Sequence, residues 1–418
     1  MPYLPEAKTE ALKAIPGAAR LLASVGDRPG TYLVGGAVRD LMLGFAQFDF
    51  DIVVEGEAAE LADHLVATIG GRTRKHDRFH TATFYSDDGA LSVDIATART
   101  ETYAKPGALP EVFPSDLEHD LVRRDFTVNA MALSIWNERL GELKEYPDAS
   151  ADLAARVLRV THDMSFVDDP TRLFRLLRYG ARLGFSAEPH TEDLARAAVE
   201  SEAPSTVSGT RLGAELIDLL AERAALVAID SMYALGLDRA VHPKFHADEY
   251  VAARVLSNLP DGVRQELVLL ALCARSMDAE SAKPWLRDLG LNQKDAAIVL
   301  EGITQAELVT VELSDDVSAA EVASALRRYH PETLCLAAGL PSTPPKYASM
   351  MREWLGDRSA GRLEISGADL RDAGIGEGPA IGKALSSTLD ATLNGEVSGR
   401  QEQLEHALRI AREERETV

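Results

Sequence analysis

Residues 31–54 have the sequence TYLVGGAVRDLMLGFAQFDFDIVV, in which one apolar run ends in two glycines and a second contains two aspartates. The first run, Thr31–Gly36, has the β-branched and aromatic composition of a strand. A strand that ends in Gly35-Gly36 and leads into a helix lets backbone N–H groups approach a phosphate closely, and Arg39 follows one turn later. On its own, such a turn is more often structural.

The second run, Phe48–Val54, carries an acid pair. In a strand, residues i and i+2 point to the same face, so Asp49 and Asp51 are expected about 6.6 Å apart while Phe50 turns into the core. Neighbouring ionised carboxylates repel unless a hard cation such as Mg²⁺ neutralises them. With the glycine turn before it, this pair favours a two-metal phosphoryl-transfer site over a solvated strand edge.

Two further runs, Thr81–Ser86 and Leu91–Ala96, have strand composition. Asp94 is the acid of the second run, and it is predicted either as a third carboxylate near the metals or as a structural acid. Strand signals nearly vanish after residue 150, where Ala-, Leu- and Arg-rich helical periodicity takes over. Helices are predicted over residues 170–183, 191–199, 210–220, 224–235, 263–274, 319–329 and 399–414.

A third cluster is Arg123-Arg124-Asp125, followed by Asn129. We expect one of the two arginines to face a nucleotide while the other pairs with an acid such as Asp120. Asp125 and Asn129 are four residues apart, so on a helical turn they share a face and are suited to ribose hydroxyls, which both donate and accept. The alternative is a surface ion-pair turn.

A fourth cluster runs from Asp168 to Arg178. Asp before Pro is a good helix start, and that structural role is assigned to Asp168. Helical geometry then places four residues on one slowly drifting stripe, with Leu173, Phe174, Leu177 and Ala181 on the opposite face. The stripe consists of Asp169, Arg172, Arg175 and Arg178.

The composition limits the possible functions. Lys and Arg number 44 against 66 Asp and Glu, so the formal charge is −22. This balance argues against indiscriminate polyanion binding but permits a local basic stripe. The two cysteines, Cys273 and Cys335, exclude a disulfide scaffold and a Cys-rich zinc site and are expected to be buried thiols. Without a signal pattern or a long apolar run, the chain is expected to be soluble and cytosolic.

Together and in order, the four clusters resemble the tRNA nucleotidyltransferase and poly(A) polymerase family in its class II form, over roughly residues 30–185. Residues 35–51 are similar to its catalytic motif, 123–129 to its ribose-binding motif, and 168–172 to its amino-acid template for the incoming base. One departure is Asp168, where the family often has Glu. The catalytic residues predicted are Asp49, Asp51 and Asp94, of which Asp49 and Asp51 bind metal. The nucleotide-binding residues predicted are Gly35, Gly36, Arg39, Arg124, Asp125, Asn129, Asp169, Arg172, Arg175 and Arg178.

The resemblance implies an α+β protein: a polymerase-β-like head with a small mixed sheet and helices, followed by an all-α neck, body and tail. The predicted parts are a catalytic head (1–148), a neck that recognises the base (149–210), a body (211–310) and a tRNA-binding tail (311–418). The implied substrates are CTP, ATP and the 3′ end of tRNA, which is also held at its elbow, and the implied cofactor is Mg²⁺. No membrane partner is expected.

Several functions remain compatible with these motifs. The main hypothesis is template-independent addition of C and A to the tRNA 3′ end. An A-adding or CC-adding enzyme or a poly(A) polymerase of the same fold is the nearer alternative, and a catalytically silent RNA-binding protein is the alternative from another class. Retention of both Asp49 and Asp51 argues against a silent protein, because an unneutralised acid pair has no evident structural use.

Overall fold

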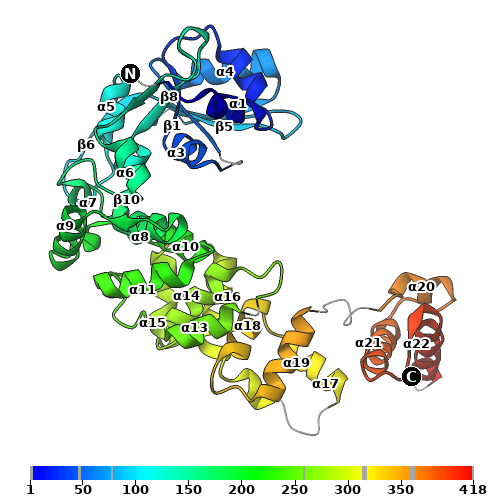
Figure 1. Ribbon diagram of the computed structural model, residues 1–418. Coiled ribbons are helices and arrows are strands. Elements are labelled where there is room, and N and C mark those ends of the chain that lie inside the picture. Colours follow the sequence, from blue (N-terminus) through cyan, green and yellow to red (C-terminus); the bar gives the residue numbers. More distant parts are fainter. Residues whose placement is uncertain are drawn as a thin grey trace. The chain divides into compact units, whose positions relative to one another are not determined.

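The computed structural model describes residues 3–45, 49–76, 79–257, 259–312, 318–356 and 363–416. The chain forms two compact units, one of Met1–Glu215 with Glu222–Ala240 and one of Leu216–Ala221 with Val241–Val418 (Figure 1). In the described part of the chain, every helix is too short or too polar to cross a membrane. The cytosolic location and the four-part division stay predictions.

The first unit is built on a seven-stranded sheet with the strand order β3-β4-β5-β2-β1-β8-β9. β2 and β5 run parallel, and all other neighbouring strands run antiparallel. The small mixed sheet and the four predicted runs are therefore confirmed. The strands are β1 Thr31–Val34, β2 Phe50–Val54, β3 Arg72–His76, β4 Thr81–Tyr85, β5 Ser92–Thr97, β8 Met131–Ser134 and β9 Leu143–Glu145.

One face of this sheet packs against α4 (Ala58–Ile69), which contacts β2, β3, β4 and β5. Lys75 of β3 forms an ion pair with Asp63 of α4, so the side chain of Lys75 points to this face of the sheet. By strand register, Lys75 is in one row with Ala82, Ile95 and Ile52, whose side chains are therefore also on the α4 side. Alternate residues, Asp51 among them, face the other way.

Part of the opposite face is covered by α5 (Leu117–Val122). An apolar cluster fills the space between the strands and this helix, and the rings of Tyr32 and Trp136 meet edge to face with centroids 5.0 Å apart. The members of the cluster are Tyr32, Val34, Val53, Ala98, Leu117, Leu121, Ala132 and Trp136. Because this cluster ends at Val53, Asp51 of the same strand remains free to face a cleft.

The rest of the first unit is largely helical. A short hairpin of β6 (Arg99–Thr102) and β7 (Glu111–Pro114) precedes α5. After residue 150, the only strands in the described residues are the two-residue β10 (Val157–Leu158) and β11 (Ser186–Ala187), as predicted. The helices are α1 Glu6–Ala14, α2 Ala18–Val25, α3 Gly36–Leu43, α6 Ala149–Ala155, α7 Ser165–Asp168, α8 Thr171–Leu183, α9 Pro189–Glu200, α10 Gly209–Ala221, which extends into the second unit, α11 Ala225–Leu235 and α12 Asp238–Val241.

The second unit is wholly helical in its described residues. Its core is α14 (Gln265–Ala274), where residues 267–274 are all buried and where Gly302 of α16 lets the two helices approach closely. Cys273 and Cys335 are both buried thiols, as predicted. The other helices are α13 Glu249–Leu256, α15 Ala279–Asp288, α16 Gln293–Gln305, α17 Ala319–Leu326, α18 Pro331–Gly339, α19 Pro345–Gly356, α20 Gly367–Asp372, α21 Pro379–Leu393 and α22 Gly399–Glu416.

Candidate active site

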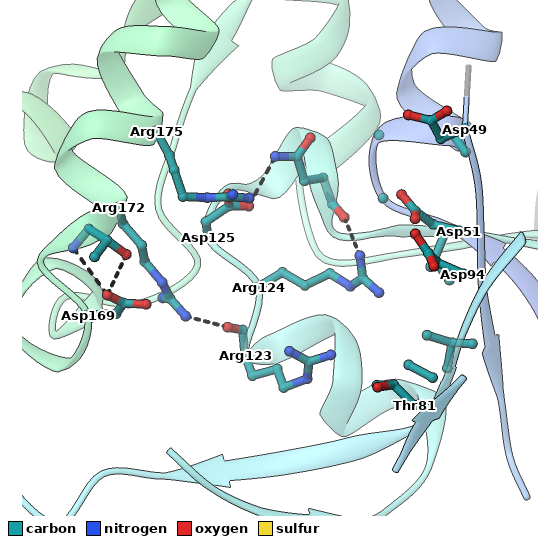
Figure 2. A pocket seen from close by; sticks show the side chains of 18 of the residues that line it. Asp49, Asp51, Thr81, Asp94, Arg123, Arg124, Asp125, Asp169, Arg172 and Arg175 are labelled. Carbon is teal, nitrogen blue, oxygen red and sulfur yellow. Dashed lines mark hydrogen bonds and ion pairs between the residues drawn. The ribbon is translucent and has the colours of Figure 1, made fainter. Parts of the chain in front are cut away.

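An open cleft of about 1130 Å³ lies within the first unit. The ends of β1 and β2, the middle of β4 and β5, the start of α3 and one face of α8 and α10 line it. Figure 2 shows three carboxylates on one side of this cleft and residues of α8 on the other, with Arg123 and Arg124 between them. Nine arginines line it: Arg39, Arg99, Arg123, Arg124, Arg172, Arg175, Arg178, Arg182 and Arg211.

The carboxylates are those of Asp49, Asp51 and Asp94. Asp51 of β2 is directly opposite Asp94 of the parallel strand β5, and Asp49 immediately precedes β2. Thr83 of β4 donates a hydrogen bond to Asp94 Oδ1 at 2.6 Å. Phe50 turns into the core, as predicted, and Phe48 lies outside the described residues. The strand register therefore adds Asp94 to the acid pair.

The electrostatics of Asp51 favour a cation at this position. Burial, reinforced by Asp94 and Asp49 and opposed by Arg124 and Arg39, raises the pKa of Asp51 to about 6. In the described residues, no three Asp, Glu, His or Cys side chains hold a metal ion by themselves. A hard cation fits this oxygen-only set when phosphate and water oxygens complete its coordination, as is usual for Mg²⁺.

Gly35 and Gly36 form the turn between β1 and α3, as predicted. Gly35 has φ +65°, and a Cβ there would lie 2.7 Å from Nη1 of Arg124, so only glycine fits. Arg39 lines the cleft, but its side chain is buried and donates to Asp40 Oδ1 (2.8 Å) and Asn129 Oδ1 (2.5 Å). The side chain of Arg39 is thus held by two partners within the protein, and its role at a phosphate stays a prediction.

Arg123 and Arg124 both bind the buried carboxylate of Asp120, at 2.7 Å and 2.9 Å. The expectation that only one of the two pairs with an acid is therefore wrong, while nucleotide binding by Arg124 stays a prediction. Burial opposes ionisation of Asp120, but the two guanidinium groups outweigh it and lower the pKa of Asp120. Both arginines still line the cleft, so Asp120 fixes two cationic side chains at its wall.

Asp125 and Asn129 are in contact, with Asn129 Nδ2 donating to Asp125 Oδ1 at 3.0 Å. They are not on an α-helix: Phe126 is extended and Thr127–Asn129 is one 3-10 turn, because Phe126 forms a β-bridge with Val160. Burial opposes ionisation of Asp125, but Arg175, at 2.6 Å, together with Asn129 and Arg172 outweighs it and lowers the pKa of Asp125 to about 2. Asp125 and Asn129, the residues predicted to bind the ribose, are thus hydrogen-bonded to each other, and Asp125 also forms an ion pair with Arg175 of α8.

The start of α8 differs in detail from the prediction. Asp168 is the last residue of α7, and its neighbour Asp169 accepts hydrogen bonds from the backbone N–H and hydroxyl of Thr171. Assigning the helix start to Asp168 was therefore wrong, because Asp169 is the acid within reach of the first turn. Arg172 is buried and donates to the Ser165 hydroxyl.

The three arginines of the predicted stripe lie on α8, whereas Asp169 precedes this helix in an extended conformation. The stripe faces the cleft rather than open solvent. Arg172 and Arg175 line the cleft with Arg178, whose neighbours include Glu215 of α10. Leu173 and Phe174 are buried on the opposite face. An arginine stripe facing a cleft is consistent with anion binding rather than with a solvated surface.

Sequence reasoning missed two residues that organise this wall. Arg211 of α10 donates to Asp169 Oδ1 and to the carbonyl oxygen of Gly107, both at 2.8 Å. The ring of Tyr179 has four guanidinium carbons 5.2–5.5 Å from its centroid, those of Arg39, Arg175, Arg178 and Arg182. Tyr179 is four residues after Arg175, so helical spacing could have predicted that its ring lies beside the arginine stripe. Arg211 had no such local signal.

The motifs and the fold agree with known proteins. The family described as "Poly A polymerase head domain" matches residues 31–159. The A-adding tRNA nucleotidyltransferase of Geobacter sulfurreducens is 35% identical, over 94% of this chain and 46% of that protein. The chain spans half or less of the length of the A-adding and CC-adding curated relatives that it matches.

Two solved structures align along almost the whole chain. An apo form of a CCA-adding enzyme has a TM-score of 0.72 and 31% identity, over 97% of this chain and 96% of that one. The Thermotoga maritima CCA-adding enzyme complexed with tRNA has a TM-score of 0.69 and 30% identity, over 98% and 99%.

The raised pKa of Asp51 leads to a stability prediction for the metal-free protein. Wild-type stability should fall as pH rises from the unfolded-state pKa, near 3.8, through about 6, because the folded protein resists ionisation of Asp51. At pH 8, with a chelator present to keep the protein metal-free, Asp51→Asn should therefore raise the free energy of unfolding by about 1–2 kcal/mol. Denaturant unfolding at pH 8 and pH 4 measures this.

The gain should disappear at pH 4, where the wild-type carboxyl is protonated. Asp63→Asn, the same change on the exposed α4 face, is the control and should give no gain. A destabilised Asp51→Asn protein at pH 8 would contradict the account of mutual repulsion.

Proposed function

The chain belongs to the tRNA nucleotidyltransferase and poly(A) polymerase family, and from this membership we propose that it adds C and A residues to the 3′ end of tRNA, from CTP and ATP and without a nucleic-acid template. The main observation behind the proposal is that three carboxylates and the arginines of α8 line opposite sides of one cleft. This pairing suits a reaction in which an RNA hydroxyl attacks a nucleotide phosphate.

Asp49 and Asp51 are proposed as the metal ligands, and Asp94 as the carboxylate beside the attacking 3′ hydroxyl. The family generally uses divalent metals, and we propose Mg²⁺ because all the available protein donors are carboxylate oxygens. The bound metal neutralises charge on the phosphates and the attacking oxygen. Thr83, hydrogen-bonded to Asp94 Oδ1, orients that carboxylate so that its second oxygen can hold the 3′ hydroxyl.

Phosphate oxygens are proposed to lie at the turn of Gly35 and Gly36, where the first backbone N–H groups of α3 are unpaired within the helix. Arg124, at the same turn, adds positive charge. Asp125 and Asn129 are proposed at the ribose, and Arg175 and Arg178 at the side of the cleft where the base lies. Asp125 remains ionised because Arg175 and Asn129 stabilise its charge.

Asp169 and Arg172 are proposed to read the base. Cytosine and adenine both present an amino donor beside a ring-nitrogen acceptor, whereas uracil and guanine present the reverse. A carboxylate only accepts and a guanidinium only donates, so the pair matches C and A. Thr171 and Arg211 occupy Asp169 Oδ1, so Oδ2 is the oxygen proposed for the amino group. Nη1 of Arg172 contacts the Ser165 hydroxyl and the His162 ring, whereas Nη2 donates one N–H to the carbonyl oxygen of Arg123, so the second N–H of Nη2 is proposed for the base.

A second candidate function is addition of the terminal A alone. It is supported by the Geobacter sulfurreducens relative, which is named an A-adding enzyme and is similar along nearly the whole of this chain. Both functions require the same carboxylates and the same template residues. They differ only in which tRNA ends are extended, and an extension assay separates them.

The first prediction of the proposal is metal-dependent extension. Purified protein receives tRNAs ending at the discriminator base, at C or at CC, each with one labelled nucleotide and Mg²⁺. C addition to the first two ends and A addition to the third support CCA addition, whereas A addition to CC alone supports the second candidate. Asp49→Asn and Asp51→Asn should lower incorporation by about 1,000-fold or more, because the reaction depends on positioning and charge neutralisation.

Asp63→Asn serves as the matched control and should retain activity, since Asp63 lies on the α4 side of the sheet. Near-normal extension by either active-site variant would exclude the metal-ligand assignment. Extension of none of the three ends by the wild-type protein would exclude both candidate functions.

The second prediction concerns base selection. In Asp169→Asn, the amide oxygen can still accept from Thr171, but the amide nitrogen presents a donor to the base. Arg172→Ala removes the guanidinium donors. Each should reduce the preference for CTP and ATP over UTP and GTP by about 10-fold or more, since unpaired polar groups no longer oppose the wrong bases. Incorporation of all four nucleotides on matched tRNA ends measures this preference.

Arg196→Ala, an exposed α9 residue paired with Glu192, should leave the preference unchanged. Retention of full discrimination by both α8 variants would mean that Asp169 is only a helix cap, worth about 1 kcal/mol of stability.

A further inference from the structure

The face of the sheet that carries the carboxylates continues to an edge strand with exposed basic residues. Strand register places Asp51, Asp94, Thr83 and Arg74 in one row across β2, β5, β4 and β3. Residues directly opposite each other in a sheet point to the same face. The cleft includes Thr83, so Arg74 lies on the next strand beyond the cleft wall and on the same face.

Two more basic side chains share this face of β3. Arg72 is opposite Tyr85, and His76 is opposite Thr81, which lines the cleft. Arg72, Arg74 and His76 are all exposed, and the Arg72 guanidinium lies 5.4 Å from the centroid of the Tyr85 ring. We call Arg72, Arg74, His76 and Tyr85 the β3 basic face.

The β3 basic face stands out against the charge of the chain, which is −22 overall. In the described residues, neither Arg72 nor Arg74 forms an ion pair with an acid, whereas the cleft arginines Arg123, Arg124 and Arg175 do. Exposed guanidinium groups beside an exposed aromatic ring are typical of surfaces that follow a single nucleic-acid strand.

Sheet order indicates which substrate reaches this face. β1, which ends at Gly35, is on one side of β2, and β5, β4 and β3 follow on the other. The proposed phosphate site at Gly35 and Gly36 therefore lies on the β1 side of Asp51. The attacking and leaving oxygens of phosphoryl transfer are roughly in line, so the RNA hydroxyl arrives from the Asp94 side. The strand behind that hydroxyl then passes over β4 and β3.

We propose that the β3 basic face binds the phosphate backbone of the RNA strand just behind its 3′ end. This inference rests on the proposed function, since it assigns the path of the RNA that the site extends. Arg74 is two strands from Asp94, about 10 Å between backbones, which lets its long side chain reach a phosphate one or two nucleotides from the reacting end. Tyr85 offers a surface on which a base can stack.

The test compares Arg72→Ala/Arg74→Ala with Lys75→Ala in the full-length chain. Lys75 is on the same strand but faces α4, so Lys75→Ala removes one positive charge, against two in the double variant, from the opposite face of the sheet. Fluorescence anisotropy over a series of salt concentrations measures the Kd of a tRNA ending in CC. Steady-state extension with ATP gives the KM for RNA, the KM for ATP and kcat.

The double variant should raise the Kd and the KM for RNA roughly five- to tenfold, as expected for two exposed charge contacts. Its salt dependence should be shallower by about 1.4 in log Kd against log salt, since each lost contact with a single strand removes about 0.7. The KM for ATP should stay within about twofold of wild type, and Arg72→Lys/Arg74→Lys should restore most of the affinity.

An RNA Kd and salt slope equal to those of Lys75→Ala would overturn the proposal, and so would an effect confined to the KM for ATP. Equal thermal unfolding midpoints show that the variants are folded. Failure of the proposed function is a separate result, seen as absence of extension by the wild-type protein. The binding measurement still tests the β3 basic face in that case.

Discussion

Asp51 and Asp94 lie directly opposite each other on the parallel strands β2 and β5, with Asp49 one residue before β2. Like charges at opposed positions destabilise a sheet, and burial adds to the cost for Asp51. The surrounding structure is arranged around this unfavourable charge: Arg124 stands near it, and Gly35 leaves room for the Arg124 side chain. Carboxylates that destabilise the fold in this way are typical of functional sites, where a bound cation and phosphate groups balance their charge.

Arginines line the rest of the cleft, so positive charges there repel one another. Four arginines are held by acids: Arg123 and Arg124 by Asp120, Arg175 by Asp125, and Arg211 by Asp169. Arg172 is instead held by the Ser165 hydroxyl and the carbonyl oxygen of Arg123. These pairs are partly or wholly buried, so removing an acid leaves an uncompensated charge. The acids thus fix the guanidinium groups in place before any nucleotide arrives, which reduces the ordering cost of binding. An acidic chain can in this way present a local basic wall.

Local patterns in the sequence accounted for the sheet core, the acid pair and the α8 stripe, because each depends on spacing of two to four residues. They failed where tertiary contacts decide. Asp125–Asn129 was expected on one helical turn, yet a β-bridge to Val160 holds Phe126 extended, and only Thr127–Asn129 form a 3-10 turn. The hydrogen bond from Arg39 to Asn129, 90 residues later in the chain, was not predicted by any local pattern. The role of Arg211 depends on Asp169 and Gly107, both distant in sequence, and no local pattern reports such a contact.

Anomalous diffraction from crystals of the full chain with Mn²⁺ and a non-hydrolysable ATP analogue tests most directly whether one cleft holds metal, phosphates and base. The account predicts an anomalous peak coordinated by Asp49 and Asp51 and by the triphosphate, with the adenine edge at Asp169 and Arg172. Manganese density away from these carboxylates, or a base bound outside the α8 wall, would contradict it.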